Sequence, residues 1–215
     1  MYIPAHFAAG DEDDIAAFVE QAGSADLVTF DGAKPVATLM PVTWDRSAGG
    51  NGRLLAHMAR ANLQWSTADP EVPGLAMVRG PQAYVSPSWY AGPKEQNRAV
   101  PTWNYTAVHF TGPLTFHTDP GWLRDVVTAL TERYEHDLDN RWWVTDAPQA
   151  YIEAQLRAIV GVEMLITQVE AKAKLSQNRG PADRAGVIAA LRSAADPQAQ
   201  EIARLMAERE ASKIS

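Results

Sequence analysis

Residues 54–62 form the first segment whose residue types suggest a chemical role. A strand is expected over Arg53–Ala56 and a short helix after it, so His57 stands where one ends and the other begins. Such a junction can present backbone N–H groups and the guanidinium of Arg60 to an anion, as phosphate sites do. A plain helix start, with an exposed Arg60 and a half-buried His57, is the alternative interpretation.

Two later segments place aromatic rings beside small hydroxyl groups and prolines. Planar ligands are held in this way, because apolar faces cover the ring and a few polar groups meet its edge. A loop anchored on the core by its Trp and Tyr side chains would explain either segment taken alone. The segments are Ala83–Tyr90, with Ser86, Ser88 and Trp89, and Val100–Tyr105, with Trp103 and Asn104.

A basic segment, Lys172–Arg179, carries three positive charges in an acidic chain and precedes a helix that is expected to begin at Pro181. Cations before a helix N-terminus suit an anionic ligand. A solvated basic turn is the other interpretation.

Several common chemical motifs are absent. The chain has no P-loop, no G-x-G-x-x-G, no G-x-S-x-G and no H-E-x-x-H, and no acid–base pair stands out. The five histidines are scattered, so their spacing does not support a metal site built from histidines and carboxylates. Without cysteine there is no disulfide framework, thiolate metal site or cysteine nucleophile.

Composition indicates a globular, acidic protein, and we expect it to be cytoplasmic. The chain has 215 residues and a formal net charge of −7, which argues against broad non-specific DNA binding. No run of 18 apolar residues occurs and the start lacks the pattern of a signal peptide, so we expect no membrane segment.

After one helix near the start, strands predominate from residue 25 to residue 118, helices follow, and one late strand returns. Asp11–Gln21 has helical periodicity, and Asp31-Gly32 between two apolar runs predicts a β-hairpin. Asp119-Pro120 has the residue types of a helix start. We expect further strands over Leu75–Arg79, Gln82–Val85 and Ile159–Val169, a loop over Ser86–Pro101, and helices over Pro148–Ala158, Pro181–Ser193 and Pro197–Ala211. Asn104–Thr118 is expected to be one strand or a bent pair, with Gly112-Pro113 as a bulge or corner. This order predicts an α+β fold with an antiparallel barrel and helices packed outside it.

Taken together, the segments resemble the PaiB-type family of FMN-binding negative transcriptional regulators. The resemblance runs from residue 1 to about residue 192 and rests on six ordered motifs. The motifs are Met1–Phe7, His57–Asn62, Gly80–Tyr90, Val100–Tyr105, Ala158–Glu163 and Lys174–Arg179.

The resemblance implies an FMN-binding split barrel, usually a homodimer with the flavin at the subunit interface. It implies a cofactor-binding domain over residues 1–180 and a C-terminal helical pair over 181–215, packed on the same domain. His57, Arg60 and Asn62 are implied on the flavin-phosphate side, and Ser86, Ser88, Trp89, Trp103 and Asn104 along the ring. Lys174, Ser176 and Gln177 are implied to reach the same pocket, either from this chain or from the partner subunit.

Three positions depart from the family pattern, and a similar branch uses another cofactor. Ala56 stands where glycine is usual, Leu63 where proline is common, and Ala173 where the family often has an aromatic residue. The piperazate synthases look similar and use haem b, and the histidine that matches His57 resembles their axial iron ligand. Haem is therefore the alternative cofactor, with His57 as its metal ligand.

Three functions stay open at this point. The first is an FMN-binding regulator that does not read DNA itself, because the charged residues of 181–215 sum to zero. The second is a redox enzyme, either a flavin-dependent split-barrel oxidoreductase or a piperazate-synthase-like haem enzyme. The third is a split barrel without a cofactor that serves as a binding module, which the residues Ala56 and Ala173 suggest.

Overall fold

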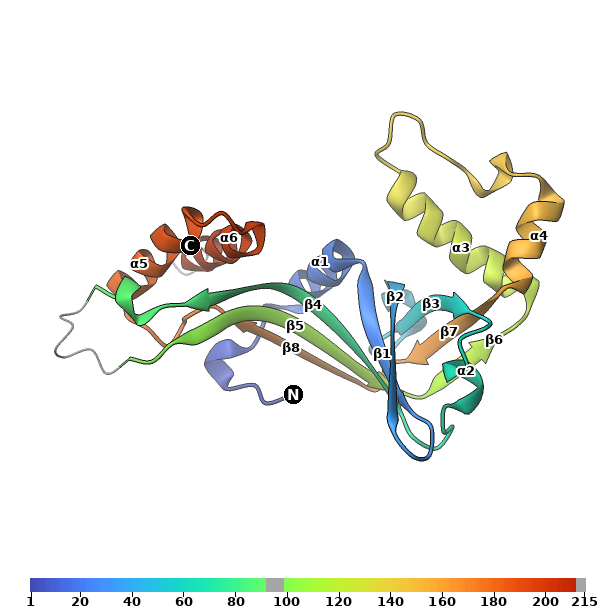
Figure 1. Cartoon of the computed structure of the whole chain (residues 1–215), viewed down its shortest axis with the longest axis horizontal. Helices are drawn as coiled ribbons and strands as arrows, with labels where there is room; N and C mark the ends of the chain where they lie inside the picture. The colour runs from blue at the N-terminus through green and yellow to red at the C-terminus, as the bar shows by residue number, and fades with distance from the viewer. Residues whose placement is uncertain (92–98, 212–215) are drawn as a thin grey trace. The chain divides into compact units, whose positions relative to one another are not determined.

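The computed structural model describes residues 1–91 and 99–211, so part of the predicted loop Ser86–Pro101 and Lys213 of the C-terminal segment lie outside the described residues. Within that part of the chain, the helices and strands follow one another as drawn in Figure 1. They are α1 (Glu12–Ala22), β1 (Ser24–Phe30), β2 (Pro35–Asp45), β3 (Arg53–Ala59), α2 (Gln64–Thr67), β4 (Gly74–Val85), β5 (Thr102–Gly112), β6 (Leu114–His117), α3 (Pro120–Glu135), α4 (Gln149–Arg157), β7 (Ile159–Leu165), β8 (Gln168–Lys174), α5 (Pro181–Arg192) and α6 (Pro197–Ala211).

The described strands form one sheet in the order β6-β7-β3-β2-β1-β4-β5-β8. The pairs β1–β2, β1–β4, β2–β3, β3–β7 and β6–β7 are antiparallel. The α+β class with an antiparallel sheet, predicted from the order of the elements, is confirmed.

The chain divides into two compact units, and β4, β5 and β8 contribute residues to both. The predicted boundary between residues 180 and 181 stays a prediction. Unit 1 comprises Met1–Ile15, Arg79–Val108 and Ala171–Ser215, and unit 2 comprises Ala16–Val78 and His109–Glu170.

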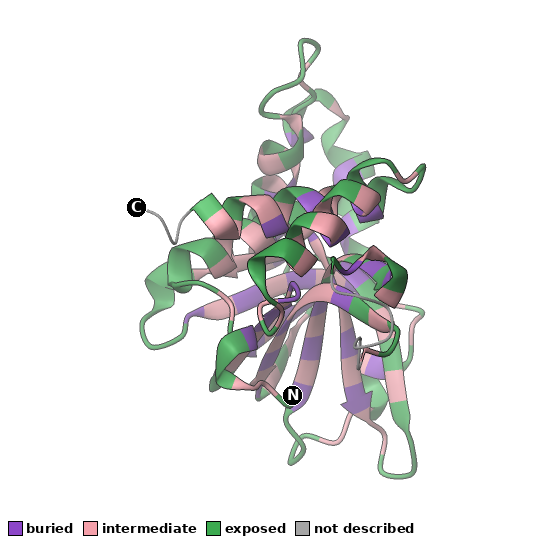
Figure 2. Cartoon of the chain, turned by 90° about the vertical axis from the view of Figure 1, so that its left-hand side faces the viewer, coloured by how far each residue is buried: buried purple, intermediate pink, exposed green. Residues whose placement is uncertain are grey.

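In unit 2 the buried side chains occupy one face of the paired strands. Burial alternates along β1 and β3. The burial colours alternate in this way along strands of the sheet in Figure 2. Because paired residues of antiparallel strands point to the same face, the register stacks the buried side chains of β3 on those of β7. The stacked pairs are Leu54 with Met164, Ala56 with Val162, and Met58 with Val160.

In unit 1 the core lies between strand residues and the C-terminal helical pair. Ala83 and Val85 on β4 and Leu175 after β8 form one buried cluster with side chains of α5 and α6. The helices contribute Val187, Leu191, Ala199, Ile202, Ala203 and Met206 to it. The two C-terminal helices therefore pack on unit 1 through apolar side chains.

Local signals predicted the helix start and the hairpin correctly. The Asp119 carboxylate accepts a hydrogen bond from the backbone N–H of Trp122 at 2.8 Å, with Pro120 in the first turn of α3. In the β1–β2 turn, Asp31 accepts hydrogen bonds from the N–H groups of Ala33 and Lys34, and Gly32 has a φ of 87°.

Three predicted strand boundaries were wrong. β4 runs through Gly80-Pro81 without a break; its pairing with β1 covers only Leu75–Met77, so the N–H that Pro81 lacks is not needed there. The predicted strand Ile159–Val169 is two strands, β7 and β8. β3 continues to Ala59, beyond the predicted end at Ala56, so His57 lies inside a strand.

Candidate functional site

His57 lies on β3 in unit 2 and does not stand at a strand–helix junction. It is paired with Gly161 of β7, so its backbone belongs to the sheet. The predicted presentation of free backbone N–H groups at His57 is therefore wrong. Only its side chain is available for chemistry.

The imidazole of His57 is partly buried, and its Nδ1 is a buried atom with no hydrogen-bond partner among the described residues. Burial lowers the pKa of His57 below its usual 6.5. The imidazole is therefore neutral at physiological pH and keeps the lone pair that a metal or a hydrogen-bond donor needs.

Arg60 and Asn62 follow in the turn after β3. The backbone N–H of Arg60 donates to Ala158 O at 2.8 Å and its Nη2 donates to Ile159 O at 3.2 Å. Its Nε is buried without a partner among the described residues. Asn62 uses both side-chain polar atoms internally, toward Thr38 Oγ1 at 2.8 Å and Gln64 N at 3.0 Å. Asn62 therefore shapes the turn, whereas Arg60 keeps an unpartnered nitrogen.

The aromatic candidates lie in unit 1. The rings of Trp89 and Trp103 each meet the ring of Tyr84 edge-on, with centroids 6.4 Å apart. Trp103 is 51% exposed, whereas Trp89 also packs against the core below α5 and α6. Trp103 therefore offers a free apolar surface.

Ser86 and Ser88 form a local cap. The Ser86 hydroxyl accepts a hydrogen bond from the N–H of Ser88 at 3.2 Å, and the two hydroxyl oxygens are 2.8 Å apart. This arrangement begins the short 3-10 helix Pro87–Trp89. The two serines thus set the direction of Trp89.

Asn104 and Ser176 are brought together in the interior of unit 1. Asn104 is fully buried and its Nδ2 lies 2.9 Å from Ser176 Oγ and 3.4 Å from the Met206 sulfur. Ser176 is 4% exposed and has a φ of 62°, in the left-handed region that L-residues rarely adopt. The pair joins β5 to the turn after β8, and its polar atoms point at each other.

Lys174 and Gln177 are also held by the chain itself. The Lys174 ammonium donates to Thr102 Oγ1 at 2.6 Å and to the carbonyl of Trp103. Burial, and then the neighbouring cations, lower the pKa of Lys174. The Gln177 side chain bonds Leu175 N at 2.7 Å and a carbonyl of β8, which closes the turn.

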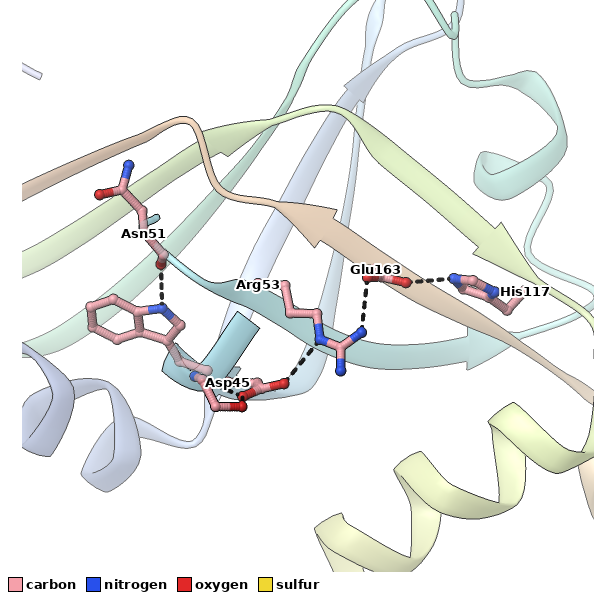
Figure 3. Close-up of polar contacts among 7 residues, drawn as sticks. Asp45, Asn51, Arg53, His117 and Glu163 are labelled. Atoms are coloured by element: carbon pink, nitrogen blue, oxygen red, sulfur yellow. Dashed lines mark hydrogen bonds and ion pairs between the residues drawn. The ribbon is translucent and has the colours of Figure 1, made fainter. Parts of the chain in front are cut away.

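The sequence patterns missed a polar array on unit 2. His117 Nε2 lies 2.8 Å from Glu163 Oε2, and Glu163 Oε1 lies 3.2 Å from Arg53 Nη1 (Figure 3). Arg53 Nε in turn lies 2.9 Å from Asp45 Oδ2. The four groups come from four strands and up to 118 positions of the chain separate them. No local spacing could reveal the array, and the one indication was Glu163 at the end of the motif Ala158–Glu163.

A pocket of about 640 Å³ opens in unit 2 away from the predicted residues. It lies between α1, the end of β2 and the C-terminal part of α3, and none of the candidate residues lines it. Its walls include Val19, Thr43, Trp44, Arg133 and Arg141.

The chain is similar to proteins of known family and fold. A family model described as "Putative FMN-binding domain" matches residues 1–168. The chain belongs to this family. The resemblance to PaiB-type FMN-binding proteins, predicted from six motifs, is confirmed.

A curated relative covers nearly the whole chain. The protease synthase and sporulation protein PAI 2 of Bacillus subtilis is 34% identical over 207 residues, which are 96% of this chain and 96% of the relative. The chain is thus similar to a PaiB protein along its full length, the C-terminal helices included.

Two solved structures share the fold. The flavocytochrome Anf3 from Azotobacter vinelandii has a TM-score of 0.57 at 14% identity, and covers 84% of this chain and 74% of its own. The FAD and heme binding protein from Mycobacterium smegmatis has a TM-score of 0.55 at 13% identity, and covers 77% and 72%. At these identities the likeness shows the fold alone, and the predicted split barrel is confirmed.

Two kinds of feature are absent from the part of the chain that the structure describes. No helix among them is long and apolar enough to cross a membrane. In the same part of the chain, no group of three or more His, Asp or Glu side chains is placed to hold a metal ion.

Proposed function

We propose that this FMN-binding family member is a regulatory protein that responds to a flavin or small molecule and does not read DNA itself. The observation that carries the proposal is the pair of unpartnered buried nitrogens, His57 Nδ1 and Arg60 Nε. Eight buried side-chain polar atoms lack a hydrogen-bond partner among the described residues, and these two come from one short segment, His57–Arg60. Because buried polar atoms in native proteins are usually hydrogen-bonded, this pair suits a bound ligand.

The residues of unit 2 fit the phosphate end of FMN. Arg60 supplies a guanidinium whose Nε has no partner within residues 1–91 and 99–211, and guanidinium is well suited to a phosphate dianion. His57 supplies a neutral ring that can donate or accept a hydrogen bond. When bound, FMN supplies reversible electron and hydride transfer.

Unit 1, taken by itself, offers a surface for a planar ring, and we propose that the exposed face of Trp103 binds one, with Trp89 as an apolar neighbour and Ser86 and Ser88 as polar neighbours. The Lys174 ammonium donates a hydrogen bond to the backbone carbonyl of Trp103 and so helps to position the Trp103 side chain. Asn104, Ser176 and Gln177 are proposed to shape this surface of unit 1, since their polar atoms are already paired.

We also propose that the protein is a homodimer. Tyr84 and Trp103 leave two large aromatic rings exposed in contact with each other, which a monomer does not need. Sedimentation equilibrium should give twice the chain mass, and replacement of both Tyr84 and Trp103 by Glu should lower it. A monomeric wild-type protein would contradict this proposal. A cytoplasmic location stays a prediction.

Haem is the second candidate, and one observation favours it. Neutral imidazole is the form that binds iron, and burial keeps His57 neutral with a free Nδ1. The two solved structures described above carry haem or cytochrome in their names, but they share only the fold. If haem binds, the likeness to the piperazate synthases makes a redox enzyme the function to test.

An absorption spectrum separates these functions. Purified protein is depleted of cofactor, and separate samples are mixed with FMN or with haemin and passed through gel filtration. The absorption spectrum of the protein fraction should show that FMN is retained. His57→Ala should weaken FMN retention and abolish iron ligation, while His109→Ala on another partly buried histidine should change neither. A protein that retains neither cofactor would leave only the binding-module function.

A further inference from the structure

Two histidines lie in one row across the sheet of unit 2. His57 of β3 and His117 of β6 are both direct partners of Gly161 on β7, the strand between them. Directly paired residues of antiparallel strands point to the same face. The two imidazoles therefore flank the position where Gly161 has no side chain.

The indole of Trp122 fills that position. A Cβ built on Gly161 would overlap ring atoms of Trp122, so the indole lies directly on the glycine backbone. The same ring stacks on His117, with centroids 4.0 Å apart and an angle of 12° between the planes. Cβ atoms of paired residues are about 4.5–5.5 Å apart, so the indole lies beside His57 as well.

Trp122 is fixed from two sides. Its backbone N–H is held by the Asp119 carboxylate at the start of α3. Its stacking partner His117 is held by Glu163, which Arg53 holds in turn (Figure 3). Asp45 closes the series: it accepts hydrogen bonds from Ser47 Oγ at 2.6 Å and from Arg53.

The series of charges gives His117 one ring orientation. Glu163 accepts the Nε2–H of the imidazole, which fixes the plane on which the indole can stack. Because Asp45, Arg53, Glu163 and His117 sit on four different strands, these contacts tie the imidazole to the sheet. None of these side chains was assigned to the cofactor site.

We propose that Trp122 is the wall that closes the His57 imidazole off from water, and that the array Asp45–Arg53–Glu163–His117 holds this wall in place. Trp122 and His117 are then positioning residues of the cofactor site. The inference rests on the proposed function only in taking His57 as the ligand-binding group. It explains why a glycine stands at 161: any larger side chain would displace the indole.

The test measures access to His57 in cofactor-free protein at fixed neutral pH. Diethylpyrocarbonate modifies neutral imidazoles, and mass spectrometry of peptides gives the rate at each histidine. His136, with a side chain 72% exposed, serves as the internal reference. Trp122→Ala should raise the relative rate at His57 roughly tenfold. His117→Ala should raise it in the same direction, and His117→Phe, which keeps a stacking ring, should restore the slow rate.

Leu123→Ala is the matched control. Leu123 follows Trp122 on α3 and is buried in the cluster against which Trp122 also packs, so Leu123→Ala should destabilise α3 while the indole ring itself is kept. An equal rise in Leu123→Ala and Trp122→Ala, or no rise in Trp122→Ala, would overturn the proposal. A rate in Glu163→Leu equal to wild type would overturn the role of the array.

A second arm keeps the two proposals apart. Wild-type protein is first incubated with FMN or with haemin and then modified. Protection of His57 supports the proposed function. Absence of protection, together with a raised rate in Trp122→Ala, would reject His57 as the ligand-binding group and leave the wall of Trp122 established.

Discussion

At the scale of single residues, the candidates differ in what their polar atoms already bind. Asn62, Asn104 and Gln177 direct their side-chain polar atoms at the chain itself. His57 and Arg60 keep a buried nitrogen without a partner among the described residues. A residue type in a motif therefore did not tell which side chain is available to a ligand, because that depends on neighbours far away in the sequence.

Ser176 allows two effects to be separated by a pair of variants. Both Ser176→Ala and Ser176→Gly remove the hydroxyl that meets Asn104, but only glycine relieves the left-handed backbone at φ 62°. Since that conformation costs an L-residue about 1–2 kcal/mol, Ser176→Gly should be the more stable variant by about 1 kcal/mol. Urea unfolding measures the difference. Equal stabilities would mean that the backbone at 176 relaxes.

Asp45 should contribute a stability that depends on pH. Hydrogen bonds from Ser47 and from Arg53 lower its pKa below 3.8 in the folded protein. A lowered carboxyl pKa stabilises the fold above the unfolded pKa, and this contribution is lost as the pH falls through the folded pKa. Asp45→Asn should therefore lower the free energy of unfolding at pH 7, and its difference from wild type should shrink at acid pH.

The control for this measurement is Asp137→Asn, since the Asp137 side chain is 97% exposed. The free energy of unfolding of Asp137→Asn should equal that of the wild-type protein at every pH. A difference between Asp45→Asn and wild type that stays constant down to acid pH would show that the lost contact does not depend on ionisation.

At the scale of elements, local signals predicted most helices and strands, and failed where pairing between distant strands decides. The cap at Asp119 and the turn at Asp31 lie in a few consecutive residues, so the sequence contains the whole cause. The extension of β3 through His57 depends on pairing with β7, about a hundred residues later. Non-local pairing of β6 with β7 likewise brings His117 close to Glu163, and the spacing of residues could not predict this contact.

Gly186 of α5 lies close to the backbone of Trp89, and substitution of this glycine tests how tightly the two segments pack. A Cβ at this position would overlap the carbonyl oxygen of Trp89, which is backbone and cannot rotate away. Helix propensity alone favours Gly186→Ala by about 1 kcal/mol, whereas the overlap should make it destabilising by about 1–3 kcal/mol. The sign of the change in thermal unfolding decides between them.

Gly180→Ala is a suitable comparison because nothing lies within 4 Å of the added Cβ. It should change the stability by less than about 1 kcal/mol. A stabilised Gly186→Ala variant would show that α5 can move away from the helix Pro87–Trp89.

At the scale of the whole molecule, charge argues against a direct reader of DNA. The net charge is −7, and arginines of the C-terminal helices are engaged within the chain. Arg184 pairs with Glu210, and Arg204 pairs with Glu201 and Glu208. A helical pair in which Arg184 and Arg204 are already ion-paired offers less positive charge to phosphate.

Fluorescence anisotropy with double-stranded DNA at physiological salt should therefore show only weak binding that falls further as salt is raised. Charge reversal of Glu201 and Glu208 to Lys should strengthen this non-specific binding. Tight, sequence-specific binding by the unmodified protein would contradict a mechanism that works through a partner or small molecule.

An equilibrium titration tests whether this chain binds FMN. Cofactor-free protein titrated into FMN should quench the flavin fluorescence to saturation at one FMN per chain. Riboflavin, which lacks the phosphate, should bind more weakly, and Arg60→Met should remove most of that preference. Absence of saturable FMN binding would contradict the proposal that this chain binds FMN with its phosphate at Arg60.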